Sequence, residues 1–320
     1  MNSVPTLDDI RRAAERIKPY AHHTPVLTSR SINRLTGAEI FFKCENFQKA
    51  GAFKFRGACN AIFSLEESER SRGVATHSSG NHAAALSLAA GIRGCHAYIV
   101  MPRNAPAVKQ AAVREYGGNI IFCESTYQSR QDVLARVVAE TGAVFIHPFN
   151  DYRIITGQGT AALELLEEVP HLDIVMTPVG GGGLLSGTAI AVSELSPDTQ
   201  IIGAEPLGAD DAYRSFVSGA IQSCTDPHTI ADGLRTAHLG DLTFPIIRQR
   251  VQQIITVSDE SIIAAMRHVW ERMKIIIEPS AGVPLAAIFE RGADFQGKRI
   301  GIVLSGGNVD FDSLPWQHRG

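Results

Sequence analysis

The chain has 320 residues, of which 44% are hydrophobic and 20% are charged, and its formal net charge is −3. This length favours two lobes or one large α/β unit, and the composition is ordinary for a soluble globular enzyme. The near-neutral charge gives no electrostatic footprint for nucleic acid or an anionic membrane, so a small molecule is the expected partner.

The N-terminal segment and the cysteines indicate the compartment. Residues 1–6 lack the basic and apolar pattern of a signal peptide, and no apolar run reaches the length of a membrane span. The five cysteines are dispersed, odd in number and form no C-x-x-C pair. We therefore expect a cytoplasmic protein whose cysteines are reduced packing residues.

Short apolar segments rich in β-formers alternate along the chain with longer helical patterns. The expected strands cover residues 40–43, 73–76, 97–101, 119–122, 144–146, 174–176, 201–204 and 300–304. The expected helices include residues 81–90, 107–116, 129–140, 159–168, 187–195 and 259–273. This alternation predicts an α/β fold with parallel sheets covered by helices on both faces.

We expect two domains in this fold. The segment 71–149 contains several strand and helix units of its own and is predicted to form a small domain. It is inserted between residues 1–70 and 150–320, which together are predicted to form a discontinuous large domain. Ligands in such sheets bind outside the carboxyl ends of the strands, so the loops at these ends are candidates for chemistry.

The loop Phe53-Lys54-Phe55 follows the first expected strand, within Glu45–Ala58. An amine between aromatic rings is desolvated, which lowers its pKa and suits it to forming a Schiff base. The alternative is a surface lysine whose stem covers apolar neighbours, and an isolated Phe-Lys-Phe triplet favours this alternative.

Two further polar loops follow expected strands. The first is His77-Ser78-Ser79-Gly80-Asn81-His82, which precedes an alanine-rich helix and holds more polar residues than one helix cap requires. Hydroxyl, amide and N–H groups at a helix start suit a carboxylate. The second is Ser305-Gly306-Gly307-Asn308, which is either a plain turn or a loop that offers a hydroxyl to a ligand.

Four consecutive glycines, Gly180, Gly181, Gly182 and Gly183, lie between an expected strand and an expected helix. Without Cβ atoms, successive N–H groups can turn toward one phosphate, and the helix dipole adds partial positive charge. A tight turn or a packing contact between layers explains the run equally well. The loop matches neither the P-loop motif nor the dinucleotide fingerprint, which indicates a smaller phosphate compound.

Taken together and in this order, these motifs resemble the fold-type II enzymes that use pyridoxal 5′-phosphate, the tryptophan synthase β-like fold. The resemblance extends from about Ile17 to Trp316 and is strongest to the group of serine racemases, threonine dehydratases and 3-hydroxyaspartate dehydratases. It is carried by KCENFQKAGAFKFRGA, ATHSSGNHA, ITGQGT, PVGGGGLLSG, AEPLGADDAYRS, IADGL, EPSAGV and LSGGNVD.

The resemblance implies a role for each loop. Lys54 would bind the cofactor covalently, Phe53 would pack near its ring, Asn81 would bond the ring hydroxyl, and Ser305 would meet the ring nitrogen. Gly180, Gly181, Gly182 and Gly183 would hold the cofactor phosphate. The implied reaction is elimination of water from a hydroxy amino acid, with Ser79 acting on the opposite face of Cα in racemisation. Ser78, Ser79, Asn81 and His82 would hold the substrate α-carboxylate.

Arg130 bears on the identity of the substrate. It matches an arginine that serine racemases and 3-hydroxyaspartate dehydratases place near the substrate side chain, and its guanidinium suits a second carboxylate. A solvated arginine at a helix start is the alternative. Gly51-Ala52-Phe53 resembles the hydroxyaspartate dehydratases, so we expect 3-hydroxyaspartate to be converted to oxaloacetate and ammonia. Serine or threonine dehydration and serine racemisation are the close alternatives.

A metal site is implied by the loop Glu205–Asp211. Two carboxylates and a backbone carbonyl, from Glu205, Asp211 and Ala209, offer oxygen ligands to Mg²⁺, Ca²⁺ or Mn²⁺. The alternative is a solvated acidic loop, but the resemblance to the racemase group favours the metal. Lys49 and Lys109 match positions near a nucleotide effector site in some relatives, whereas Arg30 stands where those have a small serine.

Three further expectations come with the family. A homodimer is implied by the resemblance, and ATP is a candidate effector without further support. A fold-type II synthase is disfavoured by the Ser-Ser-Gly-Asn-His loop and the acidic loop. A binding or regulatory protein without activity is a function of another class, and the joint retention of Lys54, Ser79 and Ser305 argues against it.

Overall fold

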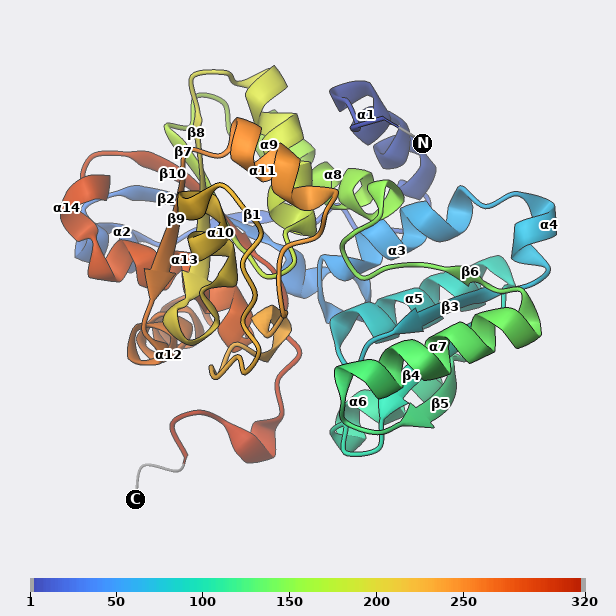
Figure 1. Ribbon diagram of the computed structural model, residues 1–320. Helices are drawn as coiled ribbons and strands as arrows, with labels where there is room; N and C mark the ends of the chain where they lie inside the picture. The colour runs from blue at the N-terminus through green and yellow to red at the C-terminus, as the bar shows by residue number, and fades with distance from the viewer. Residues whose placement is uncertain (1–2, 318–320) are drawn as a thin grey trace.

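The computed structural model describes residues 3–317, which form two sheets covered by helices (Figure 1). The larger sheet has six strands in the order β1-β2-β10-β7-β8-β9, and the smaller has four in the order β5-β4-β3-β6. The strands are β1 Val26–Thr28, β2 Glu39–Cys44, β3 Val74–His77, β4 Ala97–Pro102, β5 Asn119–Cys123, β6 Val144–Phe145, β7 Ile174–Pro178, β8 Gln200–Pro206, β9 Gln253–Val257 and β10 Arg299–Leu304.

Helices connect the strands and cover the sheets. They are α1 Leu7–Ile17, α2 Arg30–Thr36, α3 Lys54–Phe63, α4 Glu67–Arg70, α5 Asn81–Arg93, α6 Ala107–Glu115, α7 Tyr127–Thr141, α8 Tyr152–Glu168, α9 Gly183–Leu195, α10 Asp211–Ser218, α11 Thr243–Arg250, α12 Asp259–His268, α13 Pro279–Glu290 and α14 Gly292–Phe295. Single turns lie at 45–47, 49–51, 207–209, 232–234 and 311–313, and a π-turn at 269–273 follows α12.

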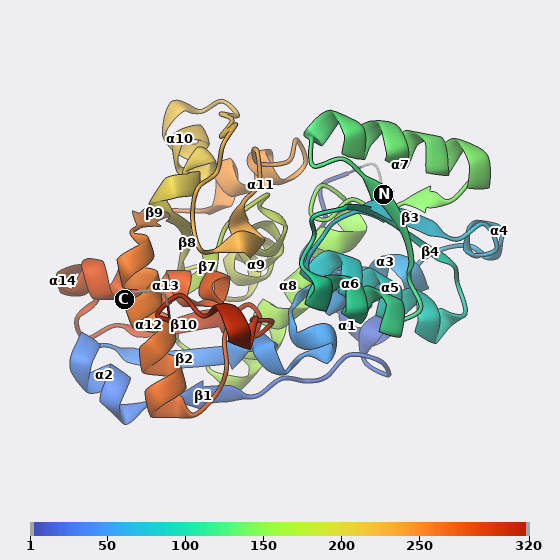
Figure 2. The same cartoon turned by 90° about the horizontal axis from the view of Figure 1, so that it is seen from below.

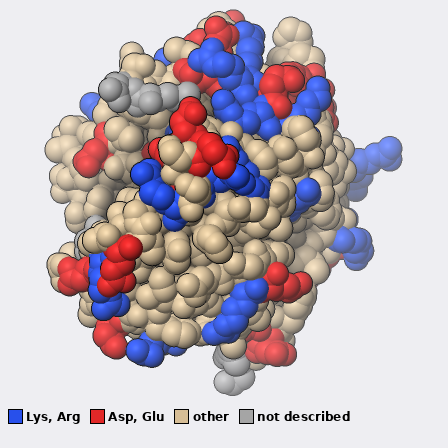
Figure 3. Space-filling view, turned by 90° about the vertical axis from the view of Figure 1, so that its right-hand side faces the viewer, with Lys and Arg blue, Asp and Glu red and all other residues tan. Residues whose placement is uncertain are grey.

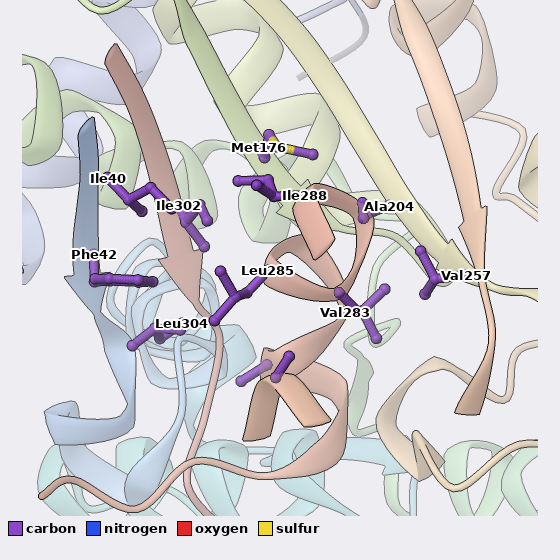
Figure 4. Close-up of a cluster of buried hydrophobic side chains, with 14 of the residues drawn as sticks. Ile40, Phe42, Met176, Ala204, Val257, Val283, Leu285, Ile288, Ile302 and Leu304 are labelled. Atoms are coloured by element: carbon purple, nitrogen blue, oxygen red, sulfur yellow. The ribbon is translucent and has the colours of Figure 1, made fainter. Parts of the chain in front are cut away.

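Both faces of the six-stranded sheet are buried, which explains its continuous apolar strands. Neighbouring residues of β7 show this, because Met176 faces the layer of α13 and Val175 faces the layer of α8 and α9. Figure 4 shows the first of these cores, with side chains of α13 packed against those of β2, β10, β7, β8 and β9. All strand pairs of this sheet are parallel except β1 with β2.

The four-stranded sheet is entirely parallel and has its own helices. Helix α7 lies over one face, and α5 and α6 lie over the other (Figure 2). Parallel strands with a helical crossover between them place all their carboxyl ends at one edge. The loop that carries Ser78 and Ser79 leaves β3 at this edge.

Helices α3 and α8 lie between the two sheets and join them (Figure 1). Their contact depends on facing glycines, because a Cβ on Gly157 would lie 2.5 Å from Cα of Gly57 and 2.7 Å from the carbonyl oxygen of Arg56. On the other side of α8, a Cβ on Gly187 would lie 2.4 Å from the carbonyl oxygen of Ile155. These glycines therefore let α3, α8 and α9 approach backbone to backbone.

The structure confirms the predicted fold class and corrects some of its elements. Each of the eight expected strands is present, but β1 and β9 were missed, although the run Gln253–Val257 has the β-branched residues of a strand. The sequence placed Lys54 in a loop, and it is instead the first residue of α3. Helix α8 begins seven residues before the expected Gly159 because Asp151 caps it with its side chain. The domain boundaries stay a prediction.

The surface carries no large field of one charge on the face shown in Figure 3, where acidic and basic side chains are interspersed and separated by uncharged surface. This distribution agrees with the near-neutral net charge of the sequence. No helix in the described part of the chain is long and apolar enough to cross a membrane.

The contact between α3 and α8 predicts the effect of a single methyl group. In Gly157→Ala, the new Cβ meets backbone atoms that have no flexible end to move, so we expect a loss of about 1–3 kcal/mol in unfolding free energy and a clearly lower melting temperature. Gly292→Ala is the matched control, because nothing lies within 4 Å of its Cβ position. Equal melting temperatures for both variants and the wild type, measured by differential scanning fluorimetry, would refute this account of the contact.

Candidate active site

The candidate residues come from both sheets and meet beside the start of α3. Ser305 directly follows β10, and its carbonyl oxygen accepts a hydrogen bond from the Phe53 N–H at 3.0 Å. The glycine run follows β7 and leads into α9. Asn81 begins α5 after β3 of the smaller sheet. The site therefore lies where the carboxyl ends of strands from the two sheets face each other.

A buried ion network fixes the first turns of α3. The Arg56 guanidinium lies 2.7 Å from Glu45, at the end of β2, and 2.7 Å from Glu164 on α8. The Lys43 amine lies 2.7 Å from the same Glu164 carboxylate. The side chains of Arg56, Glu45 and Lys43 are fully buried, so removing any one of them leaves an uncompensated charge. This network holds β2, α3 and α8 together two residues from Lys54.

Lys54 is a desolvated amine with a lowered pKa. Its Nζ donates to the carbonyl oxygen of Pro148 at 3.0 Å and lies 5.1 Å from the ring centroid of Phe53. Burial lowers the pKa of Lys54 to about 8, although the Glu278 carboxylate opposes this shift. The side chain is only partly buried by area, so a ligand can still reach the amine. Of the two interpretations of Phe-Lys-Phe, the structure favours the desolvated amine.

The four glycines are buried, and their surroundings support both a packing contact and an anion site, the two interpretations that the sequence left open. A Cβ on Gly181 would lie 2.4 Å from the Phe149 ring, and one on Gly182, where φ is +91°, would lie 2.8 Å from Thr243. Protein side chains therefore fill the space that larger residues would need. Within residues 3–317, the N–H groups of Gly181, Gly182 and Gly183 have no protein acceptor, which suits them to an anion at the start of α9.

Asn81 is held by two other polar side chains. Its Nδ2 lies 2.9 and 3.0 Å from the two carboxylate oxygens of Glu278, and its Oδ1 accepts from Nδ2 of Asn308 at 3.0 Å. Glu278 is 3% exposed, and burial, with a contribution from Asp232, raises the pKa of its carboxyl to about 7. The amide of Asn81 is therefore oriented by partners from the carboxyl end of the large sheet.

Histidines extend the site toward Arg130. Burial lowers the pKa of His82 well below its usual value and that of His147 to about 4, and nearby positive groups add to both shifts. His77, whose ring lies 5.8 Å from that of His147, has a lowered pKa because of burial and the Arg130 charge. Nε2 of His77 and Nε of Arg130 are buried and have no protein partner in the described chain. The histidines are uncharged at neutral pH because their pKa values are lowered, so the positive charge of this row comes from Arg130, which suits a negatively charged group.

The structure places Ser78 and Ser79 on the partly buried loop between β3 and α5. Ser78 Oγ accepts a hydrogen bond from the Gly80 N–H at 3.3 Å, which shapes the loop before Asn81. His82 is buried and points its Nε2 to the carbonyl oxygen of Ile146 at 3.4 Å, while its Nδ1 has no protein partner within residues 3–317. His82 also lies close enough to Lys54 for the charge of the amine to contribute to the lowered pKa of the imidazole.

Glu205, Ala209 and Asp211 form a separate cluster at the end of β8. All three are fully buried, and the Glu205 oxygens accept the N–H groups of Ala212 and Tyr213 at 3.0 and 2.9 Å. Burial raises the pKa of Asp211 to about 7, and burial together with the Asp211 charge raises that of Glu205 well above its usual value. Both Asp211 carboxylate oxygens lack a protein partner in the described residues. This rules out a solvated acidic loop.

Sequence reasoning missed several residues of the site. Glu278 appeared only within a motif, and Asn308, Phe149 and His147 were given no role. Thr236 was missed as well: its hydroxyl is buried without a protein partner within residues 3–317, and it lies 3.4 Å from the Cβ position of Gly180. The sequence held a signal only for the helix start beside Glu278, because Pro279 suits the first position of a helix.

Comparisons with known proteins agree with this geometry. A family model described as pyridoxal-phosphate dependent enzyme matches residues 17–306. A β-hydroxyaspartate dehydratase of Paracoccus denitrificans is 52% identical over 98% of this chain and 99% of its own. The crystal structure of serine racemase from Dictyostelium discoideum has a TM-score of 0.92 at 52% identity, covering 96% of this chain and 100% of its own. The structure of maize serine racemase has a TM-score of 0.94 at 50% identity, covering 97% and 95%.

The lowered pKa of Lys54 predicts its reactivity. In protein freed of any carbonyl ligand, reductive methylation of Lys54 should follow the neutral fraction of the amine and rise with pH around a midpoint near 8. Peptide mass spectrometry at each pH gives the extent of labelling, with the exposed Lys18 as an internal reference. Labelling of Lys54 that runs parallel to that of Lys18 at every pH would show that its amine is not desolvated.

Proposed function

This chain belongs to the fold-type II pyridoxal-phosphate-dependent enzymes, in the group of serine racemases and hydroxyaspartate dehydratases, and we propose that it is a hydroxy amino acid dehydratase. The proposed reaction converts 3-hydroxyaspartate to oxaloacetate and ammonia. The observation that carries this choice is the partly buried Arg130, whose Nε has no protein partner in the described chain and which lies near His77. A substrate with a second carboxylate would satisfy these groups.

The residues of the site fit pyridoxal 5′-phosphate. The unpaired N–H groups of Gly181, Gly182 and Gly183, together with Gly180, would hold its phosphate at the start of α9. Asn81 would bond the ring hydroxyl, and Ser305 would meet the ring nitrogen. Phe53 would pack near the ring, and Lys54 would form the covalent link. When bound, the cofactor supplies an electron-withdrawing ring that acidifies the Cα–H of the substrate.

The chain's own residues move the protons. Lys54, whose pKa is lowered to about 8, would take the Cα proton at Nζ. The β-hydroxyl would leave as water, and the proton taken from Cα balances the one that the departing hydroxyl needs. One water molecule would be consumed when hydrolysis releases ammonia and the oxo acid. Ser78, Ser79, Asn81 and His82 hold the α-carboxylate near the start of α5. Ser79 is the proposed proton donor on the opposite face of Cα.

Serine racemisation with serine or threonine dehydration is the second candidate. It is supported by the Dictyostelium serine racemase, which is as similar to this chain as the Paracoccus dehydratase. A catalytically reduced binding protein is disfavoured by the lowered pKa of Lys54, because pure binding needs no desolvated nucleophile. A homodimer and ATP regulation stay predictions. Lys109, one of the two lysines behind the ATP prediction, forms an ion pair with Asp232.

A divalent cation is the proposed ligand of Glu205, Ala209 and Asp211. The two carboxylates are buried, their pKa values are raised, and both Asp211 oxygens lack a protein partner within residues 3–317. A bound divalent cation would supply the positive charge and the contacts that these carboxylates need. Within residues 3–317, no group of three or more His, Cys, Asp or Glu side chains could hold a metal ion. The site would therefore rely on two carboxylates, the Ala209 carbonyl and water, and its role would be structural or activating.

A substrate panel tests the proposed function. The wild type should form oxo acid and ammonia fastest from a 3-hydroxyaspartate stereoisomer, compared with L-serine, D-serine and L-threonine, and Lys54→Ala should be inactive on all of them. Arg130→Ala should lose about 100-fold in kcat/KM for hydroxyaspartate, because a charge-assisted bidentate contact is removed, with little change for serine. Product and enantiomer assays give the rates.

Two controls accompany the panel. Arg130→Lys keeps the charge but not the bidentate geometry and should be intermediate. Arg103→Ala removes an exposed arginine on the smaller sheet and should behave as the wild type. Unchanged hydroxyaspartate kinetics in Arg130→Ala would disprove the proposed substrate, and activity in Lys54→Ala would disprove the whole assignment.

The cation site makes a prediction about pH. Because the pKa of Asp211 is raised to about 7 from 3.8, the carboxyl must lose a proton to bind a cation below that pH. Added Mg²⁺ or Ca²⁺ should therefore raise the melting temperature more as pH rises through 7. Asp211→Asn should abolish the shift, and Asp198→Asn, at an exposed position, should keep it. A melting temperature that does not respond to metal or chelator at any pH contradicts the site.

A further inference from the structure

Glu278 stands at the centre of the polar contacts around the cofactor ring site but has no role in the proposed reaction. Its N–H donates to the carbonyl oxygen of Gly306 at 3.0 Å, which fixes it beneath the loop 305–308. A Cβ on Gly306 would lie 2.7 Å from the Glu278 carboxylate, so only glycine allows this approach. Two residues later, Ser280 Oγ accepts the Gly233 N–H at 3.1 Å and so joins the loop that contains Gly233 to the start of α13.

The contact between Glu278 and Asn81 specifies how the Asn81 amide is oriented. Two oxygens of one carboxylate subtend a much narrower angle at Nδ2 than the two N–H bonds of an amide make, so one hydrogen is shared between both oxygens. The second Nδ2 hydrogen has no protein acceptor within residues 3–317. Asn308 occupies Oδ1 of Asn81 and also donates to the Ala50 carbonyl oxygen at 2.8 Å.

Asn81 is thereby restricted to one kind of contact. Its oxygen already has a donor, and its remaining group is an N–H, so toward a ligand it acts as a donor. A rotated amide would bring its oxygen against the Glu278 carboxylate and its nitrogen against the Asn308 amide, which costs both hydrogen bonds. A donor in this place favours a ligand oxygen that carries negative charge.

We propose that Glu278 is a positioning residue that holds the Asn81 amide as an obligate donor and so stabilises the ring oxygen of the cofactor in its anionic form. The proposal rests on the proposed function, because that function supplies the ring. Glu278 acts through Asn81 and needs no contact with the cofactor. The charges that act on its carboxylate are Asp232 and Lys109, and the carboxylate in turn acts on the Lys54 amine.

The decisive variant is Glu278→Gln, measured above pH 8, because it keeps the shape and removes the charge that the carboxyl carries above its pKa of about 7. A glutamine amide can donate to Asn81 Oδ1 as well as accept from Nδ2, so Asn81 is free to rotate. We expect pyridoxal phosphate to bind about tenfold more weakly by equilibrium dialysis, as the loss of one charge-assisted hydrogen bond implies. The visible absorbance of the bound cofactor should also shift in position or band ratio. Asn308→Ala, which frees Asn81 from its other partner, should shift the absorbance in the same direction.

A purely structural role is distinguished by the stability of the cofactor-free protein. Removing a buried charge that has no cationic partner in contact should leave its melting temperature unchanged or raise it in Glu278→Gln. A large drop in that temperature with wild-type affinity and absorbance would overturn the proposal. Glu278→Asp keeps the charge with a shorter reach and should be intermediate, and it carries the test if the glutamine variant does not fold. Glu290→Gln, which changes a carboxylate that contacts Ser258 outside the site, is the matched control.

The outcome also separates this inference from the function on which it depends. A wild-type protein that binds no pyridoxal phosphate, or a Lys54→Ala variant that keeps the visible absorbance, would disprove the proposed function. Normal cofactor binding in the wild type together with an unaltered Glu278→Gln variant would disprove the role of Glu278 alone.

Discussion

The buried contact of Arg56 with Glu45 and Glu164 is the constraint on which the rest of the site depends. It fastens the start of α3 to the end of β2 and to α8, and α3 carries Lys54 at its first residue. Burying a guanidinium is costly unless every N–H finds an acceptor, and here two carboxylates and the Thr160 hydroxyl accept them. This buried contact lies at the junction between the sheets, and it holds α3 in place there, because a small displacement of α3 would move the reactive amine.

Lys54 lies between positive charge on the side of the smaller sheet and a carboxyl group on the side of the larger sheet. Toward the smaller sheet, the Arg130 charge lies beside the uncharged histidines His77 and His147, and the unpartnered nitrogens of Arg130 and His77 suit a carboxylate. Toward the larger sheet, the Glu278 carboxylate accepts a hydrogen bond from the Asn81 amide and so orients that amide. The pKa of the amine between them is lowered mainly by burial rather than by a neighbouring cation. Binding and proton transfer therefore rely on different physical causes.

The sequence predicted what depends on local pattern. Continuous apolar runs predicted the strands of both sheets. The run Gly180–Gly183 predicted a close approach to the backbone, but no local pattern could predict that Phe149 and Thr243 are the residues that approach it. Contacts between distant segments were out of reach: Glu278 and Asn81 are 197 positions apart, and nothing near either residue indicates the other. The three-residue β1 was too short to carry a periodicity, and the resemblance to a family, rather than physics, identified the cofactor.

The hydrogen bond from Lys54 to the Pro148 carbonyl has a mechanical consequence. The donor is on the helix anchored to the larger sheet, and the acceptor lies where the chain leaves β6 of the smaller sheet, 94 positions later. The hydrogen bond of the amine therefore depends on the distance between α3 and the segment that follows β6. Any change in how α3 sits against the segment after β6 would change the partner of the amine and, with it, the pKa of the amine.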